Sequence, residues 1–296
     1  MNRLRVGTRG SDLAQKQTEW VCERLCAASR NVAIDQVVIK THGDIAIDQR
    51  IDESWPVGAF VSALEGALLE QRIDVAVHSY KDLQTTPTPG LSIAAVPVRE
   101  AVHDVLLTAT ELQLHELPPG ARIGTSSPRR AAQMKRLGDI EIVPIRGNVP
   151  TRIAMLQSDG LDGVILAAAG LRRLGIRHRH WIDLPTDAFV PAPGQGALAV
   201  QVRSGSDAAA VVAVLDDEPS RRCVIAERSF LTEINAGCHT PTGALATIST
   251  TSVSLHACLF SDDHSRHVDG HESGTDPAAV GAALAHRLIR ELEPLG

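Results

Sequence analysis

The sequence predicts an α/β protein with two parallel-sheet domains around a cleft, followed by a small α+β domain. Three observations carry this prediction. Strand-type and helix-type segments alternate from the N-terminus to about residue 175, as they do in parallel sheets. A polar loop repeatedly falls where a strand ends and a helix begins. Within 251–260 the apolar residues alternate with period two, which is typical of a half-exposed antiparallel strand.

The first part of the chain reads as strand, helix, strand, helix, strand. Residues 4–8 form the first expected strand, and Ser11 is expected to cap the helix that follows. A second strand is expected within 31–41, a second helix over about 59–70, and a third strand over 73–79. The third strand runs into His-Ser-Tyr-Lys-Asp. A buried strand does not need this many polar side chains at its end, so the cluster indicates a functional site.

The middle of the chain repeats this pattern within residues 121–138, 140–160 and 163–175. Pro128 stands at the expected first position of one helix, and Asn148 is the expected cap of the next. Each polar loop lies at the carboxyl end of its strand and opens a helix. Open α/β sheets bind ligands at such positions, because the first N–H groups of a helix are available to anions.

A stretch rich in proline and glycine, FVPAPGQGALAVQVR, interrupts the alternation, and its last seven residues read as a strand that returns to the first sheet. A helix over about 220–234 is expected to precede a loop with Cys238, and Pro277 to open the last helix. The expected boundaries are 1–97 with 197–215 for domain 1, 98–196 for domain 2 and 216–296 for domain 3.

Composition argues against several classes of function. The net charge of −6 disfavours general nucleic-acid binding, and no apolar run approaches the length of a membrane span. Because no secretory signal precedes the first strand, a cytoplasmic protein is expected. Five cysteines without a Cys-x-x-Cys pair disfavour a disulfide framework, and the histidines lack the acidic or thiol partners of a metal site.

Five loops, GTRGS, HSYKD, GTSSPRR, IRGNVPTR and AGLRRLG, are rich in arginine, serine and threonine. Folded as above, they converge on one cleft that suits a ligand with several negative groups, since arginine binds carboxylates bidentately. Asp82 is the sole carboxylate in these loops. It weakens anion binding and is therefore a candidate for chemistry, such as stabilising a cation formed during reaction. Cys238 lies in NAGCHTPTGA, an expected exposed loop with an accessible thiol.

Eight stretches give a specific resemblance. In chain order they are GTRGSDLA, THGD, DVAVHSYKD, GTSSPRR, IRGNVPTR, LAAAGLRRLG, PAPGQGAL and AGCHTPTGA. Together they resemble the porphobilinogen deaminase (hydroxymethylbilane synthase) family over nearly the whole chain. The resemblance implies periplasmic-binding-protein-like α/β domains and a transferase of porphyrin, tetrapyrrole and haem biosynthesis. Such an enzyme joins four porphobilinogen molecules head to tail and releases ammonia at each step.

The resemblance also implies roles for single residues. It places a dipyrromethane cofactor in thioether linkage on Cys238 and the catalytic carboxylate at Asp82. The other implied cofactor-binding residues are Lys81, Ser79, Thr125, Ser127, Arg129, Arg130 and Arg146. The implied substrate-binding residues are Arg9, Ser11, Arg152, Arg173 and Gln195. No metal is expected, porphobilinogen is the expected small-molecule partner, and the family suggests a monomer.

One segment departs from the family. From Trp55 to Glu65 the chain reads WPVGAFVSALE, and Ser62 and Ala63 stand where the family has a lysine and a glutamate. An altered lid can change how a growing chain is handled. Two alternatives therefore stay open. One is a diverged paralogue that makes a shorter or different oligopyrrole. The other is a non-catalytic anion-binding protein, which would need neither Asp82 nor Cys238.

Overall fold

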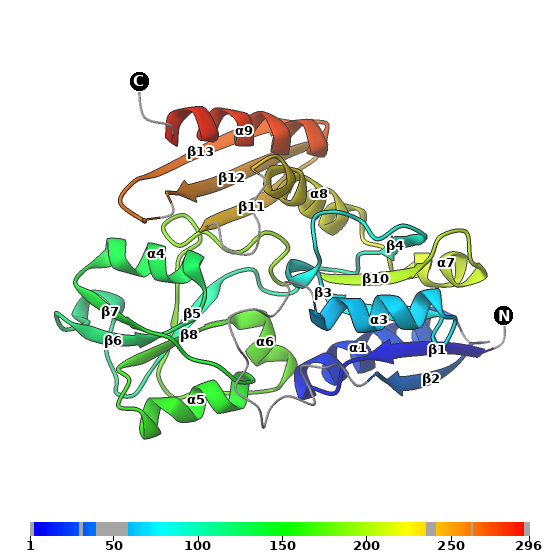
Figure 1. The fold of residues 1–296 in the computed structure, drawn as a ribbon, viewed down its shortest axis with the longest axis horizontal. Coiled ribbons are helices and arrows are strands. Elements are labelled where there is room, and N and C mark those ends of the chain that lie inside the picture. The colour runs from blue at the N-terminus through cyan, green and yellow to red at the C-terminus, as the bar shows by residue number, and fades with distance from the viewer. Residues whose placement is uncertain (1–2, 30–31, 40–58, 235–240, 262, 293–296) are drawn as a thin grey trace. The chain divides into compact units, whose positions relative to one another are not determined.

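The computed structural model describes residues 3–29, 32–39, 59–234, 241–261 and 263–292 (Figure 1). The chain divides into two compact units. The first comprises residues 1–100 and 197–221, and the second comprises residues 101–196 and 222–296.

The first unit is built on a five-stranded sheet with the order β2-β1-β3-β10-β4. Its strands are β1 (Arg3–Thr8), β2 (Ala33–Val38), β3 (Val75–Ser79), β4 (Leu91–Ala95) and β10 (Leu198–Arg203). As predicted, β1 pairs in parallel with β2 and β3, and the segment after residue 196 returns to this sheet. However, β10 runs antiparallel to β3 and β4, so the sheet is mixed rather than parallel.

Helices cover both faces of this sheet. Val77 of β3 packs in one cluster with Leu25 of α1 (Asp12–Ala28), whereas Ala76 packs in another with Leu64 of α3 (Ala59–Leu69). Successive side chains of a strand point to opposite faces, so α1 and α3 lie on opposite faces of β3. Ser11 caps α1 as predicted, because its hydroxyl accepts the Ala14 N–H at 3.4 Å. The unit also contains the 3₁₀ turns η2 (Tyr80–Asp82) and η4 (Ala213–Leu215) and the helix α7 (Asp207–Val212).

The second unit contains a five-stranded sheet with the order β7-β6-β8-β5-β9. Its strands are β5 (Asp104–Thr108), β6 (Ala121–Gly124), β7 (Ile140–Val143), β8 (Gly163–Ala167) and β9 (Trp181–Asp183). β6 pairs in parallel with β7 and β8, whereas β5 is antiparallel to β8 and β9. The 3₁₀ turn η3 (Leu114–Glu116) precedes β6.

A helix follows each of the three parallel strands: α4 (Pro128–Leu137), α5 (Val149–Ser158) and α6 (Ala168–Arg173). The predicted helix starts are confirmed. Ser127 Oγ accepts the Arg130 N–H at 3.4 Å, and Asn148 Oδ1 accepts the Thr151 N–H at 2.9 Å. The segments after β6, β7 and β8, which carry all the predicted site residues of this unit except Gln195 and Cys238, therefore lie at the carboxyl edge of the parallel strands.

The C-terminal part of the second unit is a three-stranded antiparallel sheet. It consists of β11 (Thr242–Ser249), β12 (Ser252–Phe260) and β13 (His267–Gly274), and the helices α8 (Glu218–Glu233) and α9 (Pro277–Leu292) supply much of its core. Gly243 packs against the loop before β10, since a Cβ there would meet the Val190 carbonyl oxygen at 2.6 Å. This close approach packs the small sheet against the loop that follows β9.

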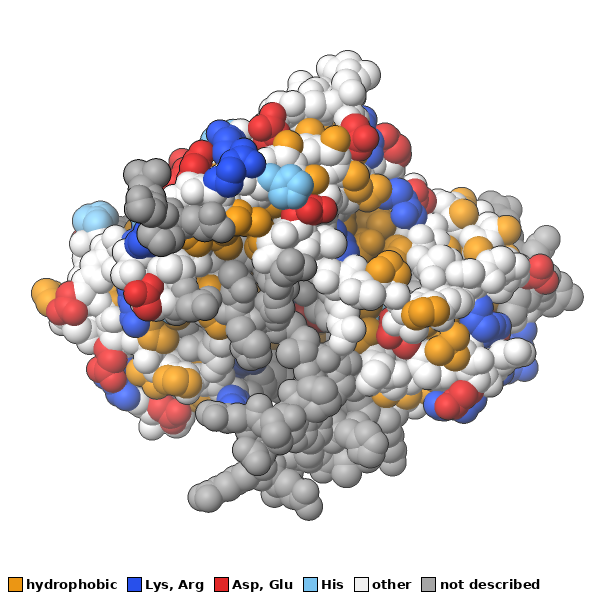
Figure 2. Space-filling model, turned by 45° about the horizontal axis from the view of Figure 1, so that its top comes forward, with side chains coloured by type: hydrophobic (Ala, Val, Ile, Leu, Met, Phe, Trp, Pro, Cys, Tyr) orange, Lys and Arg blue, Asp and Glu red, His pale blue; other side chains and the backbone are white. Residues whose placement is uncertain are grey.

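The predicted fold class is confirmed: two sheets with covering helices, and a small α+β part at the C-terminal end. The predicted three-domain boundaries stay a prediction, since the second compact unit holds two sheets. No helix among the described residues is long and apolar enough to cross a membrane. On the face drawn in Figure 2, acidic and basic side chains are interspersed.

Candidate active site

The polar cluster after β3 forms a tight turn with a buried side and an exposed side. Tyr80 N–H donates to the Ala197 carbonyl at 3.0 Å, and Leu83 N–H donates to the Tyr80 carbonyl at 3.1 Å. The Tyr80 and Leu83 side chains are buried, whereas Lys81 and Asp82 are exposed. The turn is thus anchored by its apolar residues and presents a lysine and a carboxylate to solvent.

Ser79 lies at the base of this turn. Its hydroxyl exchanges hydrogen bonds with the buried Gln17 side chain of α1, at 2.9 Å from Gln17 Nε2 and 3.2 Å to Gln17 Oε1. Arg9 and Ser11 follow β1, the parallel neighbour of β3, so both loops lie at one edge of the sheet. The first unit therefore brings five predicted residues to that edge: Arg9, Ser11, Ser79, Lys81 and Asp82.

His78 is buried directly before this edge. Burial, together with a smaller effect from the charge of Arg9, lowers the pKa of its imidazole from 6.5 to about 4, although a hydrogen bond with Gln201 opposes the shift. His78 is consequently neutral at neutral pH.

Acidification should destabilise the folded protein through His78. The unfolded imidazole binds a proton near pH 6.5, whereas the folded one binds it only near pH 4. Its contribution to stability is therefore complete above pH 6.5 and is lost as the pH falls toward 4, by roughly 2 kcal/mol at about pH 5. Urea unfolding near pH 7.5 and near pH 5 measures this loss. His78→Gln should show a smaller loss, and an equal loss in both proteins would contradict the assignment.

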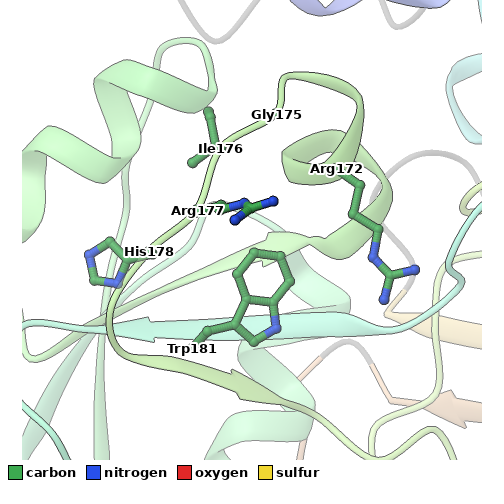
Figure 3. A pocket seen from close by; sticks show the side chains of 6 residues that line it. All are labelled: Arg172, Gly175, Ile176, Arg177, His178 and Trp181. Carbon is green, nitrogen blue, oxygen red and sulfur yellow. The ribbon is translucent and has the colours of Figure 1, made fainter.

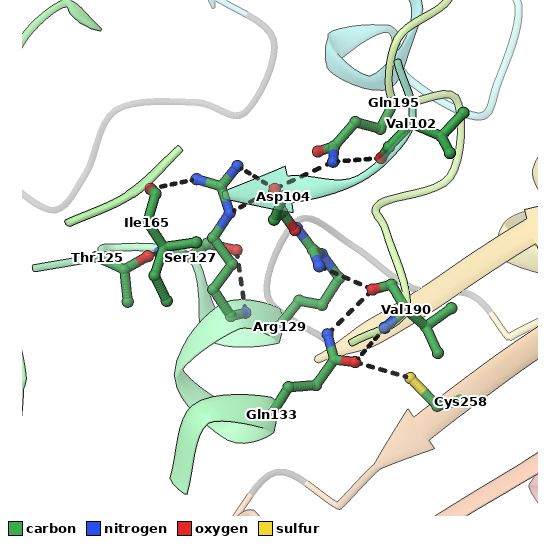
Figure 4. Close-up of polar contacts among 11 residues, drawn as sticks. Val102, Asp104, Thr125, Ser127, Arg129, Gln133, Ile165, Val190, Gln195 and Cys258 are labelled. Carbon is green, nitrogen blue, oxygen red and sulfur yellow. Dashed lines mark hydrogen bonds and ion pairs between the residues drawn. The ribbon is translucent and has the colours of Figure 1, made fainter. Parts of the chain in front are cut away.

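A buried ion cluster lies where β5 begins in the second unit (Figure 4). Asp104 is fully buried, and its Oδ1 accepts from Arg130 Nε at 3.1 Å, from Arg130 Nη2 at 2.7 Å and from Gln195 Nε2 at 3.0 Å. Asp104 Oδ2 accepts from Arg129 Nη2 at 2.7 Å. The two guanidinium groups also donate to the carbonyl oxygens of Val190 at 2.8 Å and Ile165 at 3.1 Å.

In these contacts two positive groups share one negative group. Burial lowers the pKa of Arg129, the charge of Arg130 adds to that effect, and Asp104 opposes it. Burial and the charge of Arg130 also lower the pKa of Arg152, so this third guanidinium adds to the local positive potential. An excess of positive charge that is shielded from water raises the free energy of the folded protein, and an anionic ligand would lower it again.

The other predicted residues of this unit have different surroundings. Thr125 is buried, and its Oγ1 accepts the Ser127 N–H at 3.2 Å. Arg173 Nη2 donates to the Gly196 carbonyl at 2.8 Å. Arg146 is exposed and makes no hydrogen bond or ion pair with the residues that the structure describes. Arg146 is therefore the predicted anion-binding arginine whose guanidinium is most available to a ligand.

Asp104 was missed from the sequence. Arg129 and Arg130 were expected to be available forks for a ligand, but both are engaged by this carboxylate. The available signal was an aspartate that directly precedes the apolar run Val105–Leu107. Glu227 was missed as well. It is fully buried, and its carboxylate accepts the N–H groups of Gly194 at 2.7 Å and Ala246 at 2.8 Å.

Some predicted positions fall outside the described residues, namely Cys238 and the beginning of the segment from Trp55 to Glu65. Among the described residues, no cluster of three or more histidine, cysteine, aspartate or glutamate side chains has the arrangement of a metal site.

A pocket of about 530 Å³ lies beside α6 and β9 (Figure 3). It is lined by Arg172, Gly175, Ile176, Arg177, His178 and Trp181, of which Arg172 and Gly175 belong to the predicted loop AGLRRLG.

The fold and the site define an α/β protein whose cationic and hydroxyl side chains follow parallel strands, as in proteins that bind ligands with several acidic groups. Two family models narrow this class. "Porphobilinogen deaminase, dipyromethane cofactor binding domain" matches residues 4–211, and "Porphobilinogen deaminase, C-terminal domain" matches residues 221–290. The chain belongs to the porphobilinogen deaminase family, and it is therefore a transferase of tetrapyrrole biosynthesis.

Curated relatives agree over nearly the whole chain. A porphobilinogen deaminase of Nocardia farcinica is 44% identical over 99% of this chain and 86% of its own length. One of Roseiflexus castenholzii is 40% identical over 97% of this chain and 96% of its own length. Solved structures are more distant: a YaeC-family lipoprotein of Enterococcus faecalis has a TM-score of 0.43 and 13% identity over 74% of this chain and 93% of its own. A likeness at that level carries no functional conclusion.

Proposed function

We propose that this chain is a hydroxymethylbilane synthase. It condenses four porphobilinogen molecules head to tail and releases ammonia at each step. The observation that supports this most is the buried cluster of Arg129, Arg130 and Asp104, in which positive charge exceeds negative charge at the carboxyl edge of a sheet. Porphobilinogen carries two carboxylates, and a growing chain accumulates more of them.

The donor set fits a dipyrromethane cofactor, whose side chains are carboxylates. The cofactor supplies a tethered primer to which the pyrrole units are joined, and Cys238 is the proposed attachment point. Lys81 and Arg146 are exposed cations for direct carboxylate contacts. Arg129 and Arg130 contribute mainly through their charge, because their N–H groups already bond Asp104 and two carbonyls. The other proposed cofactor contacts are the hydroxyls of Ser79, Thr125 and Ser127.

The remaining residues are assigned to substrate and to chemistry. Arg9, Ser11, Arg152, Arg173 and Gln195 are the proposed substrate-binding residues. Ammonia leaves the protonated aminomethyl group of the substrate together with the bonding electron pair, so the positive charge passes to the pyrrole and its methylene carbon. The exposed Asp82 carboxylate stabilises that charge and orients the pyrrole N–H.

We extend the proposal to partners and location. The protein acts as a monomer in the cytoplasm, with porphobilinogen as its partner and without nucleic acid or a membrane. The net charge of −6 supports the exclusion of nucleic acid, since a polyanion would be repelled.

The purified protein should carry an adduct of two linked pyrrole units on Cys238 and should form the linear tetrapyrrole. Intact mass, peptide mapping and product analysis after incubation with porphobilinogen test this. Cys238→Ala should remove the adduct, whereas Cys26→Ala, which removes an exposed thiol of α1, should keep it. An unmodified Cys238 in protein from a haem-competent host would contradict the proposal. A loaded enzyme that releases a shorter oligopyrrole would instead support the diverged paralogue with an altered lid.

A further inference from the structure

A row of polar side chains crosses the first unit directly behind the Asp82 turn. His78 Nε2 lies 2.9 Å from Gln201 Oε1, and Gln201 Nε2 donates to Glu65 Oε1 at 2.8 Å. Thr88 Oγ1 donates to the second carboxylate oxygen, Glu65 Oε2, at 2.8 Å. His78 and Gln201 are buried, and Glu65 and Thr88 are half-buried. The row, called the His78 relay below, joins β3, β10 and α3.

The chemistry of these groups fixes the direction of every bond. An ionised carboxylate only accepts hydrogen bonds, so the amide NH₂ of Gln201 must face Glu65. The Gln201 carbonyl oxygen then faces His78 and needs a donor, and Nε2 of the imidazole must carry the proton. Because burial and the charge of Arg9 keep His78 neutral, its Nδ1 carries none. The relay thus selects one tautomer and one ring orientation.

Together with the Ser79–Gln17 contact, the relay holds the end of β3 from both faces of the sheet. His78 and Ser79 point to opposite faces of the strand. On the Ser79 face, α1 reaches the strand through Gln17. On the His78 face, α3 reaches it through Glu65 and Gln201. Asp82 follows four residues after His78, so both contacts act on the end of the strand from which the turn starts.

We propose that His78 is a positioning residue for Asp82, and that Gln201 and Glu65 couple the position of α3 to the Asp82 turn. This inference rests on the proposed catalytic role of Asp82. It gives a function to the face of α3 that contacts the sheet, in a helix that also carries the divergent Ser62 and Ala63.

Gln201→Met tests the relay, because methionine keeps the length of the side chain and removes both polar groups. The turnover number kcat of the loaded enzyme should fall by roughly 10- to 100-fold, the range for misplacing a catalytic group by about 1 Å. Cofactor loading should stay complete, and KM for porphobilinogen should change less than kcat. Glu65→Gln is the conservative variant. Its carbonyl can accept from Gln201 while its NH₂ donates to Thr88, so it should keep most of the turnover.

Arg203→Met is the control for a loss of stability in the same strand. Arg203 is the last residue of β10, two positions beyond Gln201, and it lies outside the relay: its Nη1 donates to the carbonyls of Leu68 of α3 at 2.8 Å and Ile73 at 2.7 Å. This variant should lose stability and keep its kcat. If Arg203→Met lowers kcat as much as Gln201→Met does at a comparable loss of stability, the relay has only a structural role and the inference is wrong.

Two further measurements separate the relay from the proposed function. Nitrogen NMR of histidine-labelled protein, assigned with His78→Gln, should show the Nε2–H tautomer without titration between about pH 5.5 and 8. A charged or Nδ1–H imidazole would overturn the relay.

In the Asp82→Asn background, Gln201→Met should have little further effect on kcat. Full additivity of the two substitutions would also contradict the inference. If Asp82→Asn itself retained wild-type turnover, the catalytic assignment would fail while the tautomer measurement still reported on the relay.

Discussion

Asp82→Asn should leave the fold intact and lower kcat by at least about 100-fold. The amide keeps the shape of the side chain but removes the charge that stabilises a cation on the substrate, and loss of one such electrostatic group costs about 10²–10³ in rate. Stability should be unchanged, because Asp82 is exposed and makes no hydrogen bond or ion pair with the described residues. Single-turnover kinetics with porphobilinogen on fully loaded enzyme measures the effect.

The control for this prediction is Asp207→Asn, which removes another exposed carboxylate of the first unit. It should keep wild-type turnover. If Asp82→Asn and Asp207→Asn are equally active, Asp82 is not the catalytic carboxylate.

Asp104→Asn should have the largest effect on stability, a loss of about 3–5 kcal/mol in the free energy of unfolding. Removing one partner of a buried ion pair leaves an uncompensated charge, and here two guanidinium groups lose their shared carboxylate. Denaturant unfolding of the second unit, followed by its tryptophan at position 181, measures this loss. Unchanged stability would show that Asp104 does not balance these charges.

Arg146→Leu should show the opposite pattern. Because Arg146 is exposed and lies outside the cluster, its loss should change stability by less than about 0.5 kcal/mol. Cofactor loading should nevertheless fall, since a carboxylate would lose an available fork. Cofactor loading is measured as the ratio of adduct-bearing to unmodified protein in intact-mass spectra. Together with the unfolding measurement, this ratio distinguishes Arg146→Leu from Asp104→Asn.

Local sequence signals sufficed for the helix starts and for the alternation of strands and helices along the chain. Ser11, Ser127 and Asn148 each cap the helix that was expected to follow, because a cap depends only on the next three residues. The loops at the carboxyl edges followed from the alternation of strand and helix. The direction of β10 could not be predicted in this way, because strand pairing is decided by contacts between segments that are distant in the sequence.

The two buried networks were also beyond local reasoning. Asp104 meets Arg129 and Arg130 only after β5 is placed beside β8, so no spacing in the sequence indicates the cluster. In the same way, the proton on His78 depends on Gln201, which is 123 positions away. A polar residue in an apolar strand predicts that some partner exists, but the sequence does not identify that partner.

The discontinuous first sheet has a consequence for synthesis on the ribosome. Among the described strands, β4 pairs with β10 alone, and roughly 100 residues separate the two along the chain. At synthesis rates of about 5–20 residues per second, the nascent β4 waits roughly 5–20 s for its neighbour. The edge of β3 is open for the same interval, and an open strand edge is a template for mispairing. The N-terminal unit is therefore begun first and completed only after the second large sheet has been translated, so its unpaired strand edges are open to mispairing while the chain grows.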